Sequence, residues 1–109
     1  MKRGDVVIVS APGDFGKPRP AVVVQSDLLN ATHATIAVCL VTPDVSDAPL
    51  FRIPILPTPG NGLRARSEIM VDKIVSLRRN RLGAPVGALE PETMSRLDRS
   101  LALVLGLGD

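Results

Sequence analysis

The chain has 109 residues, 45% of them apolar, so there is room for one domain whose hydrophobic core folds without disulfides or metals. Its 13 basic and 11 acidic residues leave a net charge of only +2. One cysteine excludes an internal disulfide, one histidine excludes a His/Cys metal cluster, and no apolar run reaches the roughly 20 residues of a membrane span. The single cysteine and the lack of a long apolar run lead us to expect a cytoplasmic protein. We expect its core to be aliphatic, because Phe15 and Phe51 are its only aromatic residues.

The first half of the chain alternates β-branched runs with turn residues. Gly4 and Pro12 bound the first run, and the glycines that follow favour a loop before the second. Ser26 is a helix-capping residue ahead of two leucines, but the segment is long enough for only one turn. The pattern predicts a strand at 5–11, a loop at 12–20, a buried strand at 21–25, a helical turn at 26–30 and a strand at 35–41.

The second half of the chain predicts further short strands. Pro54 cannot donate to a strand ladder, so we expect its strand to lie at a sheet edge. A flexible loop with two arginines follows it. The predicted elements are a strand at 51–56, a loop at 57–66, either two strands at 67–71 and 73–77 or one bent strand, a basic turn at 78–81 and a short strand at 86–89.

One convincing helix closes the chain. Pro91 is a residue favoured in the first turn of a helix, and Gly106 is favoured just after the last turn. The side chains that share one face, and that we expect to be buried, are those of Met94, Leu97, Leu101, Val104 and Leu105. The elements predict a mostly β fold, with residues 1–109 as a single domain whose antiparallel sheet curls into a small barrel and carries short helices and a C-terminal helix.

Arg19 stands out among the polar residues. It lies between Pro18 and Pro20 at the start of a buried strand, and both prolines restrict the backbone around it. Such an arginine is held in place as a fixed cation. We expect Cys39 to be a small buried apolar residue and His33 to be an ordinary loop residue.

The basic residues are unevenly distributed. Residues 52–81 carry seven of them against two acidic ones, and ten of the 13 basic residues in the chain are arginines. Arginine suits bidentate phosphate contacts and stacking on bases, so this basic stripe favours a polyanionic partner. A solvated charged face is the alternative.

Several segments together resemble the MazF/PemK toxins of bacterial toxin–antitoxin modules. The resemblance runs through the whole chain in order, over RGDVV at 3–7, RPAVVVQSD at 19–27, the strand at 35–42, SEIMVDKI at 67–74, RLG at 81–83 and the closing helix at 101–107. It implies a small SH3-like barrel, a homodimer and a cognate antitoxin as partner. It also implies an endoribonuclease that needs no metal or other cofactor and cuts single-stranded RNA to 2′,3′-cyclic phosphate and 5′-hydroxyl ends.

The resemblance also implies the site residues. The active-site arginine of the family, which precedes a proline at the start of the second strand, falls on Arg19, and its threonine or serine at the end of the third strand falls on Thr42. Without the family, Arg19 would be a surface ion-pair residue and Thr42 a turn cap. The candidate RNA-binding residues are Lys17, Arg64, Arg66, Ser67, Lys73 and Arg78.

Two other functions stay open at this stage. The gyrase poison CcdB shares the implied fold and resembles the segment at 24–29, but it acts through a C-terminal tail containing tryptophan, whereas this chain has no tryptophan. A catalytically inactive relative that only binds its antitoxin is the third reading. The aromatic residues available for base stacking are Phe15 and Phe51, with arginine planes as the substitute.

Overall fold

The structure is a computed structural model that describes residues 1–10, 13, 17–46, 48, 50 and 51–108. The helical elements are α1 (Asp27–Asn30), the 3-10 turn η1 (Arg79–Arg81) and α2 (Pro91–Val104). The strands are β1 (Asp5–Val9), β2 (Arg19–Val23), β3 (Thr35–Thr42), β4 (Arg52–Ile55), β5 (Ser67–Arg78) and β6 (Gly87–Ala88). Within these residues, no helix is long and apolar enough to cross a membrane.

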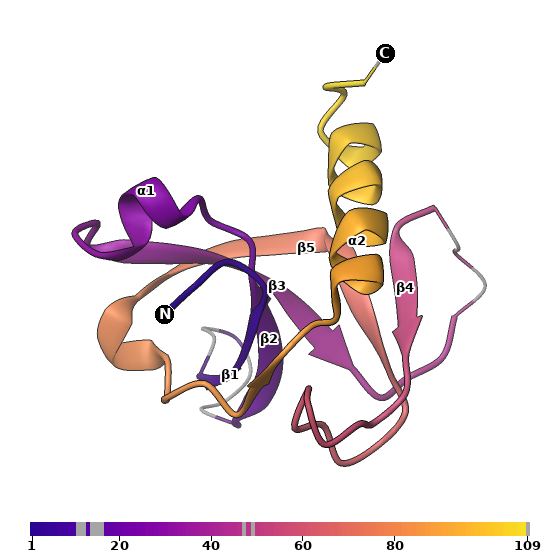
Figure 1. The fold of residues 1–109 in the computed structure, drawn as a ribbon, viewed down its shortest axis with the longest axis horizontal. Coiled ribbons are helices and arrows are strands. Elements are labelled where there is room, and N and C mark those ends of the chain that lie inside the picture. Colours follow the sequence, from indigo (N-terminus) through magenta and orange to yellow (C-terminus); the bar gives the residue numbers. More distant parts are fainter. Residues whose placement is uncertain (11–12, 14–16, 47, 49, 109) are drawn as a thin grey trace.

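The described strands form one six-stranded antiparallel sheet in the order β4-β5-β3-β2-β1-β6. The sheet curls into a half-barrel, and α2 packs against it (Figure 1). The expected mostly β fold is thereby confirmed. Pro54 lies on the edge strand β4, as its missing N–H predicts.

Several predicted boundaries differ from the structure, most clearly at the start of β2. Arg19 and Pro20 belong to β2, opposite Val9 and Ile8 of β1, and not to the preceding loop. Pairing with β3 begins only at Ala21, so the missing N–H of Pro20 removes no hydrogen bond between β2 and β3. Of the two alternatives for residues 67–77, the structure has the single strand, β5, whose register against β3 shifts between Cys39 and Val41.

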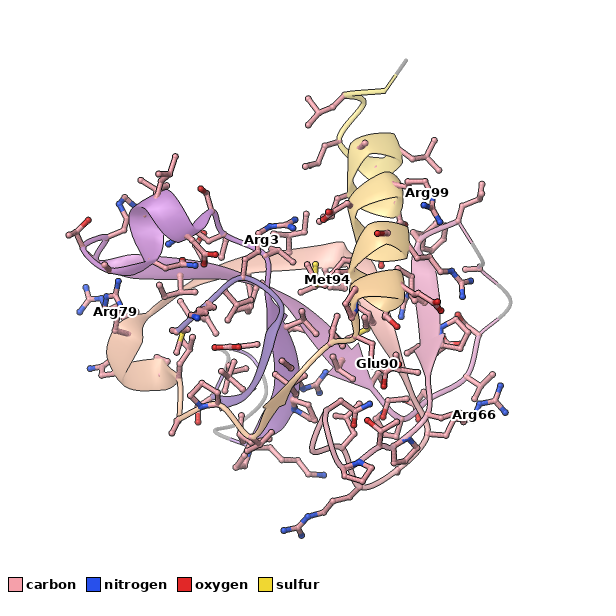
Figure 2. The ribbon with its side chains drawn as sticks, in the orientation of Figure 1. Arg3, Arg66, Arg79, Glu90, Met94 and Arg99 are labelled. Atoms are coloured by element: carbon pink, nitrogen blue, oxygen red, sulfur yellow. The ribbon has the colours of Figure 1, made fainter. Side chains whose placement is uncertain are left out.

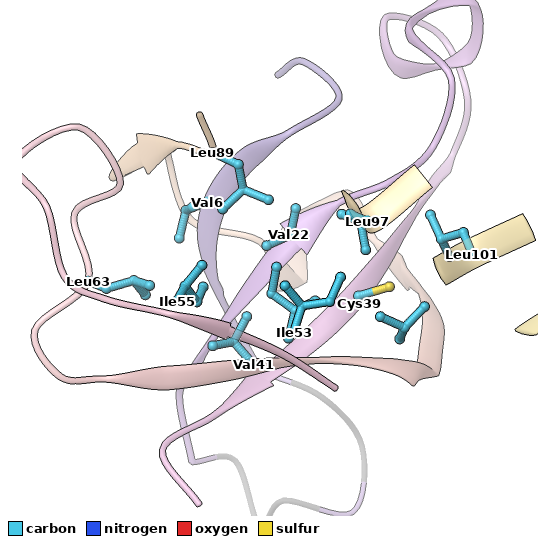
Figure 3. Packing of buried hydrophobic residues seen from close by; sticks show 12 residues of the cluster. Val6, Val22, Cys39, Val41, Ile53, Ile55, Leu63, Leu89, Leu97 and Leu101 are labelled. Atoms are coloured by element: carbon cyan, nitrogen blue, oxygen red, sulfur yellow. The ribbon is translucent and has the colours of Figure 1, made fainter. Parts of the chain in front are cut away.

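The core has two parts, one on each face of the sheet. Inside the curl lie side chains from the strands, two from connecting segments and two from α2 (Figure 3), namely Val6, Val22, Cys39, Val41, Ile53, Ile55, Leu63, Ile69, Val71, Leu89, Leu97 and Leu101. The other face buries Val7, Val9, Ala21, Val23, Ile36, Val38 and Leu77. Cys39 is fully buried, as expected, and this burial raises the pKa of its thiol to about 12.

Helix α2 begins at Pro91 and is followed by Gly106, which has a φ of +72° and stops it as predicted. Leu97 and Leu101 are buried, but the predicted burial of Val104 and Leu105 is wrong, since they are 37% and 55% exposed. The reason is visible in Figure 1, where the last turn of α2 extends beyond the sheet.

Arg3 holds the N-terminal segment to α2. Its Nη1 lies 2.7 Å from Asp98 Oδ1, and its Nε donates to the carbonyl of Val24 at 2.8 Å. Figure 2 shows Arg3 to the left of the helix, above the level of Met94. An ion pair from Arg3, which is itself hydrogen-bonded to the residue after β2, therefore holds α2 in place together with the two buried leucines of the helix.

Candidate functional site

Three polar residues form a row across β2, β3 and β5. Ala21 of β2 is paired with Leu40 of β3 at the last paired position of that ladder, and the same register continued by two residues would set Arg19 opposite Thr42. Thr42 in turn pairs with Glu68 of β5. Side chains that are directly opposite on neighbouring strands share a face of the sheet and have Cβ atoms about 5 Å apart. A cation, a hydroxyl and a carboxylate therefore follow one another across three strands.

Thr42 is the last residue of β3 and is 7% exposed. Its Oγ1 accepts a hydrogen bond from the backbone N of Asp44 at 3.2 Å, so the residue does cap the turn that follows. A hydroxyl has one donor and two acceptor positions. The O–H of Thr42 remains chemically able to donate to an anionic oxygen while the cap is kept.

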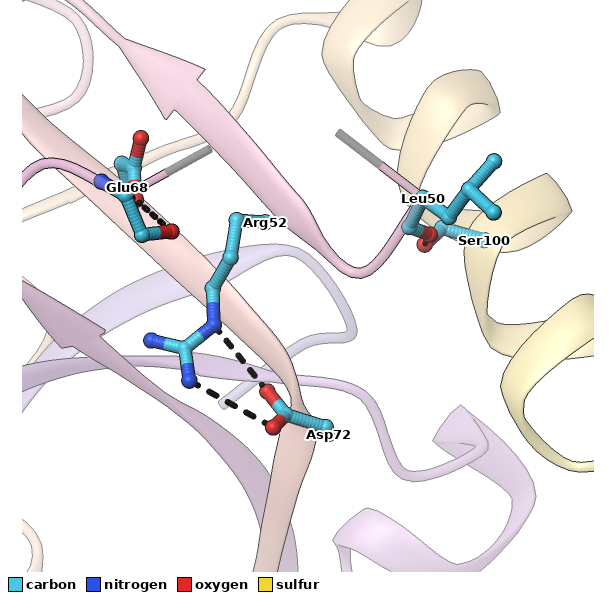
Figure 4. Close-up of polar contacts among 6 residues, drawn as sticks. Leu50, Arg52, Glu68, Asp72 and Ser100 are labelled. Carbon is cyan, nitrogen blue, oxygen red and sulfur yellow. Dashed lines mark hydrogen bonds and ion pairs between the residues drawn. The ribbon is translucent and has the colours of Figure 1, made fainter. Parts of the chain in front are cut away.

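Glu68 is a candidate site residue that the sequence pattern did not single out. It is 5% exposed, and its Oε1 accepts hydrogen bonds from both the backbone N and the Oγ of Ser46, each at 3.1 Å (Figure 4). The carboxylate thereby ties the loop after Thr42 to β5. The only sequence signal is a charged residue inside the otherwise apolar run 67–71.

A cleft of about 650 Å³ opens at this same end of the strands. Arg19 and Arg64 provide its cations, and two of its residues, Val41 and Pro43, are the chain neighbours of Thr42. The remaining walls are mainly apolar and come from Ile8, Pro18, Pro20, Gly62, Leu63, Ala65, Ser67 and Val86. The arrangement is a groove with guanidinium groups for an anion and flat aliphatic walls for planar groups.

The predicted RNA-binding residues divide between this cleft and the rest of β5. Lys17 is exposed just before Pro18, Arg66 is exposed beside the cleft residue Ala65, and Ser67 is buried, with its Oγ donating to the carbonyl of Ala65 at 2.9 Å. Lys73 is exposed further along β5, and Arg78 ends that strand.

The far end of β5 is remote from the row. Arg78 pairs with Thr35, at the opposite end of β3 from Thr42. Seven residues of strand span roughly 23 Å. The structure therefore brings Arg19, Thr42, Arg64 and Ser67 to one end of the sheet and leaves Arg78 at the other.

The basic stripe is not one continuous surface. Arg52 is paired with Asp72, with Nε 3.2 Å from Oδ1 and Nη2 3.4 Å from Oδ2 (Figure 4), and its guanidinium lies 5.9 Å from the ring centre of Phe51. Arg79, on the left in Figure 2, donates to the carbonyls of Asn30 and His33 and so caps the C-terminal end of α1. These two arginines are engaged in structural contacts.

The other candidate groups offer little chemistry. His33 contributes its backbone carbonyl to Arg79 and lies in an exposed connection, as expected. Phe15 lies outside the described residues. Within the described part of the chain, no three histidine, cysteine, aspartate or glutamate side chains gather in a way that could hold a metal ion.

The fold is shared with solved toxin structures. An endoribonuclease in complex with its cognate antitoxin from a mycobacterial species superposes with a TM-score of 0.82 and 24% identity, covering 100% of this chain and 98% of that one. The family of PemK-like, MazF-like toxins of type II toxin–antitoxin systems matches residues 2–105.

The sequence relatives agree with the fold. The probable endoribonuclease MazF of Mycolicibacterium smegmatis is 43% identical over 98% of both chains. The endoribonuclease EndoA of Bacillus subtilis is 27% identical over 100% of this chain and 97% of its own. The chain belongs to the PemK-like, MazF-like toxin family.

Proposed function

We propose that this chain is the toxin of a toxin–antitoxin module and an endoribonuclease that cuts single-stranded messenger RNA without a metal ion, stopping translation and growth. The observation that carries the proposal is the cleft lined by Arg19 and Arg64 at the end of β3 where Thr42 lies, in a chain whose relatives bear the name endoribonuclease. The comparisons do not favour the gyrase-poison alternative.

The chemistry that suits these residues is transfer of the phosphoryl group to the adjacent 2′-oxygen. The 2′-hydroxyl loses its proton and attacks phosphorus, the bond to the 5′-oxygen breaks, and that oxygen takes up a proton, which leaves a 2′,3′-cyclic phosphate and a 5′-hydroxyl. Negative charge grows on the phosphoryl oxygens in the transition state. A preorganised guanidinium opposite them lowers the barrier.

Each site residue has one role in this proposal. Arg19 stabilises the developing charge and supplies a donor near the leaving oxygen, because an arginine does not deprotonate at ordinary pH and cannot serve as the base. Thr42 donates its O–H to a phosphoryl oxygen and orients the scissile phosphate. Glu68 keeps the loop after Thr42 in place through Ser46.

The cleft suits a single strand better than a duplex. Its arginines match phosphate oxygens, and its walls of proline and aliphatic side chains offer flat surfaces to unpaired bases. Lys17 and Arg66 extend the positive charge beside the cleft. Lys73 and Arg78 lie along β5 away from it, where they serve an RNA only if the strand continues over that face.

The proposed partners are a second copy of the chain and a cognate antitoxin, with the cytoplasm as the place of action. Leu103, Val104, Leu105 and Leu107 are exposed at the end of α2 and just after it, and several exposed apolar side chains in one short segment are typical of an interface. Two-fold pairing is the commonest closed arrangement for a small chain.

The deciding experiment incubates the purified protein with end-labelled RNA in EDTA and analyses the product ends. We expect cleavage in EDTA, ends that carry a 2′,3′-cyclic phosphate, and cleavage slowed about 100- to 1,000-fold by Arg19→Ala. Cleavage that requires added magnesium would contradict the metal-independent mechanism. Protein that binds antitoxin but cuts no RNA would be the inactive relative, and inhibition of gyrase supercoiling without RNA cleavage would support the alternative toxin class.

A further inference from the structure

The segment between β4 and β5 folds around the buried side chain of Asn61, which is 4% exposed. Its Oδ1 accepts from the backbone N of Thr58 at 3.1 Å and of Leu63 at 3.0 Å, and its Nδ2 donates to the carbonyl of Leu56 at 2.9 Å. The backbone N of Asn61 donates to Thr58 Oγ1 at 3.1 Å. One amide thus crosslinks three points of a segment that the sequence predicts to be a flexible loop.

This turn is also clamped against β6. The backbone N of Ala88 donates to the carbonyl of Gly60 at 2.9 Å. A Cβ on Gly62, which has a φ of +69°, would lie 2.3 Å from the carbonyl oxygen of Val86, and a Cβ on Gly87 would lie 2.4 Å from the carbonyl carbon of Asn61. Two backbones meet here at a distance that only glycine permits.

The contact between residues 60–62 and residues 86–88 lies next to the cleft. Gly62, Leu63 and Arg64 follow Asn61 directly and line the cleft, and Val86, which Gly62 contacts, lines it as well. The hydrogen bond from Leu63 N to Asn61 Oδ1 fixes the chain one residue before Arg64. Arg64 is therefore carried by a turn whose geometry is determined before any ligand arrives.

We propose that Asn61 is a positioning residue, which acts through Arg64 to hold this guanidinium where the RNA backbone passes. This inference rests on the proposed function, because it assumes that RNA binds in this cleft. A cation on a fixed turn loses less conformational freedom when it meets a phosphate than one on a mobile loop, so its placement raises affinity. Asn61 itself is buried and touches no substrate.

The test is a double-mutant cycle on Asn61 and Arg64. The cleavage site is first mapped on a long transcript, and a short RNA of that sequence with a 2′-deoxy nucleotide at the cut serves as the uncleavable probe for Kd. We expect Asn61→Ala and Arg64→Gln each to weaken binding about five- to tenfold with kcat changed less than about twofold. In the Arg64→Gln background, Asn61→Ala should weaken binding by less than about twofold.

Two further variants keep the test decisive. Asn61→Asp keeps the two acceptor bonds but sets a buried carboxylate oxygen against the carbonyl oxygen of Leu56, so it should lower thermal stability, and where the variant is fully folded its Kd should fall between those of the wild type and Asn61→Ala. Asn80→Ala makes the same change at an exposed position in η1 and should leave Kd unchanged.

The outcomes separate this inference from the proposed function. Wild-type protein that cuts no RNA overturns both. Two results would overturn the positioning role alone, in a wild type that does cut RNA. The first is that the effects of Asn61→Ala and Arg64→Gln on Kd multiply independently. The second is that Asn61→Ala lowers thermal stability while the Kd of the folded protein stays unchanged.

Discussion

Glu68 lies directly opposite Thr42 on the neighbouring strand, and its buried carboxylate holds the backbone and side chain of Ser46, four residues beyond Thr42. The end of β3 is therefore fixed twice, by the strand pairing and by the loop that follows. A threonine held in this way keeps its hydroxyl in one place with little help from the substrate. This arrangement makes substitutions at Thr42 informative, because the surrounding backbone has independent support.

Thr42→Val removes the hydroxyl and keeps the shape of the side chain. We expect kcat to fall about tenfold to 100-fold, the range for a hydrogen bond to a charged group, while Kd for the 2′-deoxy probe changes less than about threefold. Thr42→Ser keeps the hydroxyl and should retain most activity. Equal losses in kcat and in probe binding for Thr42→Val would make the residue a binding contact.

Arg19→Ala should lower kcat about 100- to 1,000-fold, as expected when a preorganised donor to a charged transition state is lost. Arg19→Lys keeps the charge but not the planar fork, and we expect it to recover only part of the activity. Urea unfolding should show a free energy change of about 1 kcal/mol or less for both variants. An Arg19→Ala protein that fails to fold would point to a structural role for the residue.

The salt dependence of binding should locate the RNA. Changing Arg64 and Arg66 together to glutamine should reduce the slope of log Kd against log salt concentration by about 1 to 1.5, because each lost phosphate contact on a single strand accounts for about 0.7. The matched control changes Lys73 and Arg78 to glutamine and should affect the slope less. The opposite order would place the RNA along β5.

Stability at low pH should depend on Asp27. A hydrogen bond from the backbone N of Arg3 at 2.7 Å, and then one from Asn30 Nδ2 at 2.9 Å, hold the pKa of Asp27 below its usual value. A lowered pKa in the folded state means that the ionised form stabilises the fold above the unfolded pKa, near pH 4, and that this contribution is lost as the pH falls through the folded pKa. The melting temperature of the wild type should exceed that of Asp27→Asn at pH 7, and the gap should close below about pH 4. A constant gap from pH 7 to pH 2 would contradict this.

Assembly should depend on the exposed end of α2. Leu103→Glu places a charge among Val104, Leu105 and Leu107 and should shift the sedimentation mass from dimer towards monomer. Leu28→Glu makes the same change on α1, where Leu28 is 90% exposed, and should leave the mass unchanged. A wild type that is monomeric at micromolar concentration would remove the basis for the proposed dimer.

The sequence is most informative where the physics is local. β-branched runs, turn glycines and the Pro91 and Gly106 signals predict the order of the elements, because strand period and capping depend on near neighbours. The strand membership of Arg19 escapes this reasoning, since pairing with Val9 is a contact between distant segments. Prolines on both sides of Arg19 favour a loop when only the neighbours are considered.

The same limit applies to side-chain partners. Arg52 and Arg79 look like members of a nucleic-acid surface until Asp72 and the carbonyls of Asn30 and His33 are seen beside them. Glu68 and Asn61 carry no recognisable motif, because what distinguishes them is burial among particular partners. Val104 and Leu105 have the right helical period, but the period does not tell where the sheet beneath the helix ends.

The full burial of Cys39 has a practical consequence for work with this protein. A thiol with a pKa near 12 inside the sheet forms almost no thiolate at neutral pH and is out of reach of maleimides and iodoacetamide. The chain behaves as a cysteine-free scaffold while it is folded. One cysteine introduced at an exposed position such as Asn80 would therefore take a fluorophore at a single place, with the native Cys39 left intact as an internal reporter of unfolding.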